Sequence, residues 1–96
     1  FMRIFFVYIL ECSDNSYYIG VTSNIDGRLV DHQNGFDVNC YTYSRRPVKL
    51  VHSEEYKYVD QAIQREKQLK RWTRAKKQAL IDKDYEKLEQ LSGGKK

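Results

Sequence analysis

Two apolar runs near the amino terminus decide the fold: Ile4-Phe5-Phe6-Val7-Tyr8-Ile9-Leu10 and Tyr17-Tyr18-Ile19-Gly20-Val21. The segment between them, Glu11-Cys12-Ser13-Asp14-Asn15-Ser16, is a cluster of turn-forming residues. Runs of β-branched and aromatic residues joined by a short polar loop are typical of an antiparallel hairpin. We therefore expect these two runs to form the first two strands of a sheet.

The next segment predicts a short helix followed by a loop. Ser23, with Asp26 three residues later, is typical of a helix start with an acidic residue in the first turn. Asn34-Gly35 supplies the end, so the helix should span about 25–33. Residues 36–46 have little periodicity, and we expect a loop there.

The second half of the chain predicts one more strand and then helices. Pro47, the only proline, ends the loop and opens a strand over 48–56. Helical spacing begins near Val59, and Thr73 breaks or caps that helix before the next one. A final short helix is expected over 85–91. The order β-β-α-β-α-α predicts an α+β fold with a small three-stranded antiparallel sheet flanked by helices.

Length and composition favour one small folded domain. The chain has 96 residues, of which 41% are hydrophobic and 31% charged. We expect a single domain over 2–91 and a flexible tail over 92–96. The longest apolar run, 4–10, is far shorter than the roughly 20 residues of a membrane helix. We therefore expect neither a membrane span nor a signal peptide.

The two cysteines indicate a reducing compartment. Cys12 and Cys40 lie far apart in the sequence, with no CxxC pair and no nearby histidine cluster. That pattern fits neither a zinc site nor a disulfide framework, so we expect a reduced, cytoplasmic protein.

Positive charge is concentrated in one segment. The net charge of the chain is +4, but residues 61–83 alone carry +6, from eight basic and two acidic side chains, and the remainder sums to −2. Concentrated basic charge indicates a polyanion-binding surface. A solvated helix face is the alternative that charge alone leaves open.

Glu66 stands out in this basic segment. It falls in register with Ile63, Leu69 and Trp72, on the apolar stripe of the predicted helix. A carboxylate near a core face is costly unless it is paired or binds a cation. Three interpretations therefore remain open: a salt bridge to an arginine or lysine, a carboxylate at the rim of the core, and a metal ligand.

Two further pairs of side chains are candidates for the same site. Arg28 and His32 are spaced i,i+4, so both project from one face of the predicted helix. Arginine can clamp a phosphate through two bonds, and histidine donates to or accepts from oxygen near neutral pH. Tyr8 and Tyr18 occupy similar points of the two hairpin strands, where tyrosines face a common site or simply pack across the sheet.

Taken together, these residues resemble the GIY-YIG nuclease superfamily. The first motif appears as Phe6-Val7-Tyr8 and the second as Tyr18-Ile19-Gly20. Arg28 stands eight residues after the second motif, where the family has its arginine, and His32 follows where the family has His or Tyr. The run 62–72 looks like the helix that carries the family's metal-binding glutamate. The resemblance is closest to the stand-alone, UvrC-like single-domain branch (UPF0213-type).

The resemblance implies a divalent-metal-dependent endonuclease that hydrolyses phosphodiester bonds, with DNA as the favoured substrate, in DNA repair or processing. Glu66 would hold a single Mg²⁺ or Mn²⁺, and Tyr8 or Tyr18 would activate or orient the attacking water. Arg28 would stabilise charge on the phosphate, and His32 would hydrogen-bond the phosphate or a tyrosine. Basic residues in and after the glutamate helix are candidates to contact the nucleic-acid backbone: Lys67, Lys70, Arg71 and Arg74.

Two departures from the family pattern bear on activity. Phe6 stands where the name-giving glycine would be, and Val21 stands where the nucleotide-excision-repair members have a lysine. A nucleic-acid-binding module with weak or no catalysis is the main alternative. A scaffold whose basic helix meets an acidic protein or a membrane surface is a third class. The oligomeric state is left open, with a monomer favoured.

Overall fold

The amino-terminal hairpin forms as the sequence predicts. In the computed structural model, which describes residues 3–93, β1 (Phe5–Glu11) pairs antiparallel with β2 (Tyr17–Thr22). The turn between them places Asn15 at φ 69°, a left-handed conformation that asparagine tolerates better than most residues. The polar loop therefore reverses the chain tightly enough for the two apolar runs to pair along their length.

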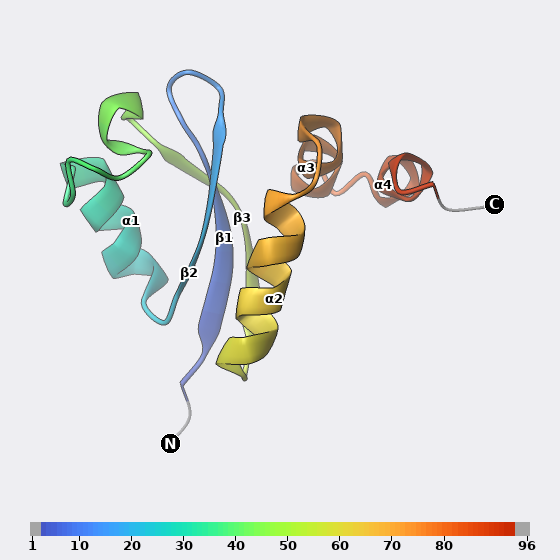
Figure 1. The fold of residues 1–96 in the computed structure, drawn as a ribbon, viewed down its shortest axis with the longest axis horizontal. Coiled ribbons are helices and arrows are strands. Elements are labelled where there is room, and N and C mark those ends of the chain that lie inside the picture. The colour runs from blue at the N-terminus through green and yellow to red at the C-terminus, as the bar shows by residue number, and fades with distance from the viewer. Residues whose placement is uncertain (1–2, 94–96) are drawn as a thin grey trace.

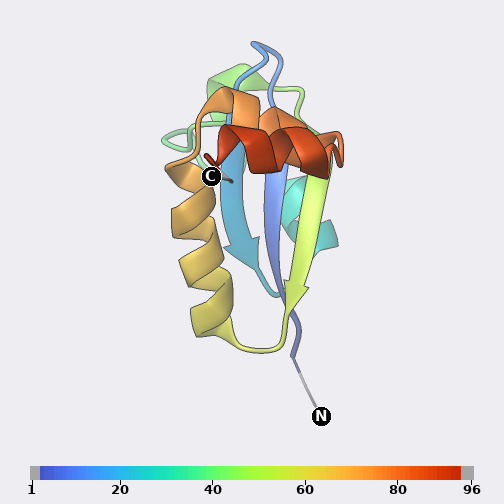
Figure 2. The same cartoon turned by 90° about the vertical axis from the view of Figure 1, so that its right-hand side faces the viewer.

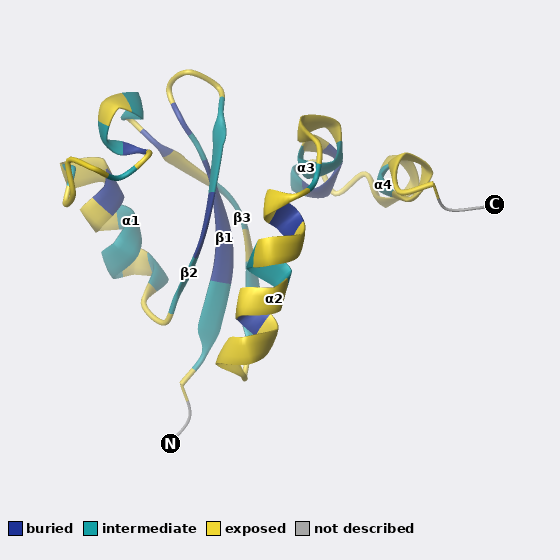
Figure 3. Ribbon diagram, in the orientation of Figure 1, coloured by how far each residue is buried: buried dark blue, intermediate teal, exposed yellow. Residues whose placement is uncertain are grey.

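A third strand completes the sheet. β3 (Lys49–Tyr56) pairs antiparallel with the other side of β1, which gives the strand order β2-β1-β3 (Figure 1). β1 is therefore central, and residues 7–10 are all buried because both faces of the sheet are covered (Figure 3). The predicted strand began one residue earlier, at Val48, which is buried just before β3.

Helices cover both faces of the sheet. α1 (Ile25–Asn34) lies on one face, together with the loop that follows it (Figure 1). On the other side lie α2 (Val59–Lys70), α3 (Arg74–Ile81) and α4 (Tyr85–Leu91) (Figures 1 and 2). The predicted α+β fold, a three-stranded antiparallel sheet flanked by helices, is confirmed. Within the described part of the chain no helix is long and apolar enough to cross a membrane.

Capping residues set the helix boundaries. α1 starts at Ile25 as predicted, but the side chain of Asn24 caps it, so the capping role predicted for Ser23 is wrong by one residue. Gly35 ends α1 at φ 69°, as predicted. Thr73 separates α2 from α3 and caps α3 through its hydroxyl. The predicted loop after α1 contains a single 3₁₀ turn, η1 (Tyr43–Arg45), and the predicted tail, 92–96, lies mostly outside the described residues.

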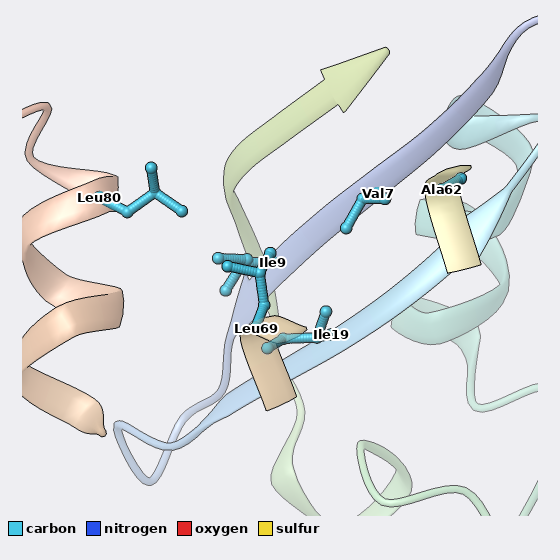
Figure 4. Packing of buried hydrophobic residues seen from close by; sticks show 6 residues of the cluster. All are labelled: Val7, Ile9, Ile19, Ala62, Leu69 and Leu80. Atoms are coloured by element: carbon cyan, nitrogen blue, oxygen red, sulfur yellow. The ribbon is translucent and has the colours of Figure 1, made fainter. Parts of the chain in front are cut away.

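The main core lies between the sheet and the helices on the α2 side (Figure 4). Its buried residues come from β1, β2, α2 and α3: Val7, Ile9, Ile19, Ala62, Leu69 and Leu80. Ala62 and Leu69 lie seven residues apart, about two helical turns, and define the buried stripe of α2. Ile63 was predicted on this stripe but is 38% exposed. The buried stripe is therefore narrower than predicted, and the half-buried Glu66 lies at its edge.

Candidate active site

The predicted catalytic residues meet at the β2 edge of the sheet. A cavity of about 580 Å³ is lined by all five of them: Tyr8, Tyr18, Arg28, His32 and Glu66. They come from β1, β2, α1 and α2. Because α1 and α2 cover opposite faces, a cavity that both helices line has to open past an edge strand, and α2 packs against β2 (Figure 2). The fold thus gathers residues that the sequence keeps far apart.

Gly20 lets Tyr8 reach this cavity. The two residues are direct partners in the register of β1 and β2. A Cβ atom at position 20 would lie 2.5 Å from Oη and 2.6 Å from Cζ of Tyr8, far inside van der Waals contact. The phenol therefore crosses β2 at the one kind of residue that leaves room for it. The glycine of the second motif is required by packing.

A chain of buried hydrogen bonds holds the Tyr8 hydroxyl. Its Oη lies 3.0 Å from Nε2 of His32, and Nδ1 of His32 lies 2.9 Å from Oγ1 of Thr42. His32 and Thr42 are fully buried, so both ring nitrogens of the histidine find their partners inside the protein. Thr42 was not among the predicted site residues, because it belongs to a loop in which no pattern marks it.

Burial decides the protonation of the tyrosines and the histidine. Burial raises the pKa of Tyr8, the neighbouring Tyr18 raises it further, and the charge of Arg28 offsets only part of this. Burial also raises the pKa of Tyr18. The pKa of His32 is lowered by burial and then by the charge of Arg28. At neutral pH both phenols therefore carry their protons and the imidazole is neutral.

Arg28 keeps hydrogen-bond donors available for a ligand. Its Nη1 lies 4.0 Å from a carboxylate oxygen of Asp31, at the outer limit of an ion pair. Its guanidinium carbon lies 5.2 Å from the centroid of the Phe36 ring, a cation–π contact. Neither contact uses the pair of parallel N–H groups, the planar fork, with which arginine binds a phosphate at two points.

Glu66 lines the cavity and also forms an ion pair. Its Oε2 lies 3.0 Å from Nζ of Lys70, one turn further along α2. The side chain of Glu66 is 20% exposed and that of Lys70 is 55% exposed, so the pair is open to solvent on the lysine side. The salt bridge that the sequence analysis listed as one interpretation of Glu66 is present. The Glu66 carboxylate in this ion pair still lines the cavity.

The donor set fits a hard divalent ion that keeps most of its water ligands. Glu66 supplies one carboxylate, and among residues 3–93 no three His, Cys, Asp or Glu side chains gather closely enough to hold a metal ion. Mg²⁺ is commonly bound by one or two carboxylates together with waters and substrate phosphates. Two carboxylates, those of Glu66 and Asp37, line this open cavity, which has room for those ligands and is compatible with that chemistry.

Of the four residues predicted to contact nucleic acid, three lie together and the fourth, Arg74, lies apart from them. Lys67, Lys70 and Arg71 line a shallow hollow on the surface of α2. The guanidinium of Arg74 lies 4.4 Å from the centroid of the Tyr17 ring and donates to a backbone carbonyl of the hairpin turn. Arg74 therefore ties α3 to the hairpin.

The loop after α1 supplies cavity residues that the sequence analysis missed. The cavity is lined, beside the predicted residues, by Phe36, Asp37, Cys40 and Tyr41. The rings of Tyr41 and Tyr18 are nearly parallel, with an interplanar angle of 19° and centroids 6.4 Å apart. The high tyrosine content of the chain, eight residues, is the only sequence signal that points to such rings.

Comparison with known proteins identifies the family. The sequence model of the GIY-YIG catalytic domain matches residues 4–79. The chain therefore belongs to the GIY-YIG domain family, a family of nucleases, as its motifs indicated. More particularly, it is similar to the UPF0213 protein of Syntrophus aciditrophicus, with 47% identity over 83 residues, 86% of this chain and 95% of the relative. A UPF0213 protein of Staphylococcus aureus is 43% identical over 76 residues, 79% of this chain and 92% of the relative.

Two solution NMR structures have the same fold. The UPF0213 protein BH0048 of Bacillus halodurans matches with a TM-score of 0.54 and 35% identity, over 82% of this chain and 83% of that one. The protein EF2693 of E. faecalis matches with a TM-score of 0.60 and 28% identity, over 86% of this chain and 88% of that one. The family and the fold class predicted from the sequence are both confirmed.

Proposed function

We propose that the protein is a divalent-metal-dependent endonuclease that hydrolyses phosphodiester bonds of nucleic acid, with DNA as the favoured substrate. One observation carries this proposal. Five side chains of the required chemistry, from four separate elements, line a single cavity at the β2 edge: Tyr8, Tyr18, Arg28, His32 and Glu66. A purely structural set of polar residues has no reason to converge on one open cavity.

Glu66 and Arg28 would handle the charge of the phosphate. Glu66 would hold one Mg²⁺ or Mn²⁺, an ion that polarises a phosphoryl oxygen and stabilises the leaving oxygen when bound. Arg28, with its fork free, would bind the phosphate that gains charge during the reaction, a contact often worth a few kcal/mol. The two residues come from α2 and α1, so the substrate phosphate would lie between helices on opposite faces.

In this proposal His32 would receive a proton from Tyr8. In the tautomer whose Nδ1–H donates to Thr42, the unprotonated Nε2 accepts from the Tyr8 hydroxyl. A Tyr8 oxygen that passes its proton to His32 can take one from the attacking water, which a phenol of raised pKa cannot do unaided. The two ring nitrogens of His32 are taken by Tyr8 and Thr42, so Tyr18 cannot use the same acceptor. Tyr8 is therefore favoured over Tyr18 as the residue that activates water.

The second candidate function is a nucleic-acid-binding module with weak or no catalysis. The observation in its favour is Val21, which lines the cavity at the position where a lysine would bring a second cation to the tyrosines. Without that charge both phenols keep raised pKa values. Binding through the basic hollow on α2 would not depend on them.

A cleavage assay on supercoiled and on single-stranded DNA, with labelled RNA beside them, separates the two functions. The wild-type protein should cleave with Mg²⁺ or Mn²⁺, a chelator should stop it, and Glu66→Gln should be slower by about a hundredfold or more. Because the Lys70 partner is largely exposed, the same change should alter the free energy of unfolding without metal by less than about 0.5 kcal/mol.

The matched control is Glu89→Gln, an exposed glutamate on α4 that should leave cleavage unchanged. Binding of nucleic acid without cleavage of any substrate by the wild-type protein would favour the binding module. The assignment of Glu66 as a metal ligand would be contradicted if Glu66→Gln lowered the melting temperature strongly and left the Mn²⁺ affinity unaltered.

A further inference from the structure

Two large aromatic side chains stand at the mouth of the cavity without being buried. Phe36 and Tyr41 both line it, yet they are 47% and 42% exposed. Both belong to the loop between α1 and η1. A ring that serves only the packing of the fold is normally buried, as the side chains of the main core are. We refer to Phe36 and Tyr41 as the aromatic rim.

Tyr41 is held in place before any ligand binds. The guanidinium of Arg45 lies 3.8 Å from the centroid of the Tyr41 ring, and its Nη1 donates to the Tyr41 carbonyl. Nε of Arg45 donates in turn to the carboxylate of Asp14 in the hairpin turn, at 3.0 Å. Because a flexible side chain loses freedom on binding, a ring fixed beforehand binds a flat ligand at lower entropic cost.

Phe36 is fixed by the proposed catalytic residues themselves. Its ring stands edge-on to that of His32, with an interplanar angle of 89° and centroids 5.3 Å apart. The guanidinium of Arg28 lies over the same ring. A ligand that contacts Phe36 therefore lies next to the groups proposed to hold the phosphate.

We propose that the aromatic rim binds an unpaired nucleobase beside the phosphate held by Arg28, so that the protein acts on single-stranded nucleotides; this rests on the proposed function. Stacking on aromatic rings tolerates any sequence, since every base has a flat face. In a duplex, neighbouring bases cover those faces, so the rim favours a base that has left the stack. The cavity volume of about 580 Å³ is in the range of sites for small ligands and can admit one nucleotide.

Binding of two oligonucleotides that carry the fluorescent base 2-aminopurine tests this subsite. One is single-stranded and one is fully duplex, and a chelator prevents cleavage. The wild-type protein should bind the single strand more tightly and change its fluorescence. The double change Phe36→Ala and Tyr41→Ala should weaken single-strand binding about tenfold and leave duplex binding within about twofold. Tyr58→Ala, which removes a tyrosine that is 62% exposed at the start of α2, is the matched control and should change neither.

Leucine and aromatic replacements guard against a folding defect. Phe36→Leu with Tyr41→Leu keeps bulk without a ring and should lose the preference, whereas Phe36→Tyr with Tyr41→Phe should keep it. The proposed role of the aromatic rim is overturned if the wild-type protein binds the two oligonucleotides equally. It is also overturned if the rim variants lose the same amount of affinity for both. A retained preference in a protein that cleaves nothing supports the rim and contradicts only the nuclease assignment. If the wild-type protein binds neither oligonucleotide, both the aromatic rim and the nuclease assignment are overturned.

Discussion

At position 20 the size of one side chain decides where Tyr8 can lie. Gly20→Ala would place a methyl group within 2.6 Å of the Tyr8 ring, so the ring has to leave the cavity or the strands have to separate. We expect the free energy of unfolding to fall by about 2 kcal/mol, as in overpacked cores, and cleavage to be lost with the Tyr8–His32 hydrogen bond. Chemical denaturation and a cleavage assay measure the two effects.

A double-mutant cycle with Tyr8→Leu isolates this clash. Without the phenol, the added methyl group at position 20 meets no ring, so Gly20→Ala should destabilise the Tyr8→Leu protein much less than the wild type. Equal destabilisation in both backgrounds would mean that the steric conflict lies elsewhere.

Lys70 and a divalent ion should compete for the Glu66 carboxylate. Nζ of Lys70 lies 3.0 Å from Oε2 of Glu66, so an ion that binds this carboxylate either displaces the ammonium group or binds next to its positive charge. Lys70→Ala should therefore tighten Mn²⁺ binding by about two- to threefold, because exposed ion pairs contribute about 0.2–1 kcal/mol. Calorimetric titration measures the change. Lys67→Ala removes the same charge one turn earlier and is the control; an equal gain there would indicate only a change in the general field.

Among the secondary-structure elements, one carboxylate ties α2 to β3. Glu54 accepts from Nε and Nη2 of Arg65 at 2.9 and 3.0 Å and from the Tyr56 hydroxyl at 2.7 Å. His52 Nε2 lies 2.8 Å from the same carboxylate. Burial alone would raise the pKa of Glu54, but the hydrogen bonds from these three side chains and the charge of Arg65 lower it to about 2.

This lowered pKa makes the α2–β3 contact sensitive to acid. Glu54 titrates near 4.5 in the unfolded chain, so its contribution is complete above that pH and is lost as the pH falls from about 4.5 towards 2. We expect Glu54→Gln to lower the free energy of unfolding by about 2 kcal/mol at pH 7 and by much less at pH 3. Urea unfolding at both pH values measures this. Glu55→Gln, at an exposed neighbouring position, should have little effect at either pH.

The helices and strands could be predicted where the hydrophobic periodicity is strong. The site residues could be predicted where they belong to the sequence motifs. Hairpin and helix bounds followed from local patterns that the packing does not override. In contrast, the path of the loop 36–46 alone brings Phe36 and Tyr41 to the cavity and Thr42 to His32, and no local preference specifies that path. The exposure of Ile63 also escaped prediction, because helical spacing identifies a face but not how wide the contact on it will be.

Over the whole molecule, positive charge collects on the helix that carries Glu66. Lys67, Lys70 and Arg71 line its basic hollow. Binding of phosphates releases counterions, so the logarithm of the association constant should fall linearly with the logarithm of the salt concentration. We expect Lys67→Ala combined with Arg71→Ala to flatten that slope by about two units on unrelated sequences.

A second pair of lysines controls for net charge. Lys49 and Lys87 lie on β3 and α4, and both are exposed. Changing both to alanine removes the same charge away from the basic hollow and should leave the slope nearly unchanged. Equal flattening by the two pairs would show that net charge, and not contact with the hollow, governs binding.

The two faces of β1, the central strand, pack into different clusters. Val7 and Ile9 belong to the core against α2, whereas Tyr8 and Leu10 belong to the cluster on the α1 side. A slip of one residue in β1 would exchange these sides, so the main core and the cavity would be lost together. A molecule with a mispaired sheet therefore cannot keep partial activity. Under the proposed function, turnover per milligram in any preparation then counts the correctly paired molecules, so the cleavage rate measures the refolding yield.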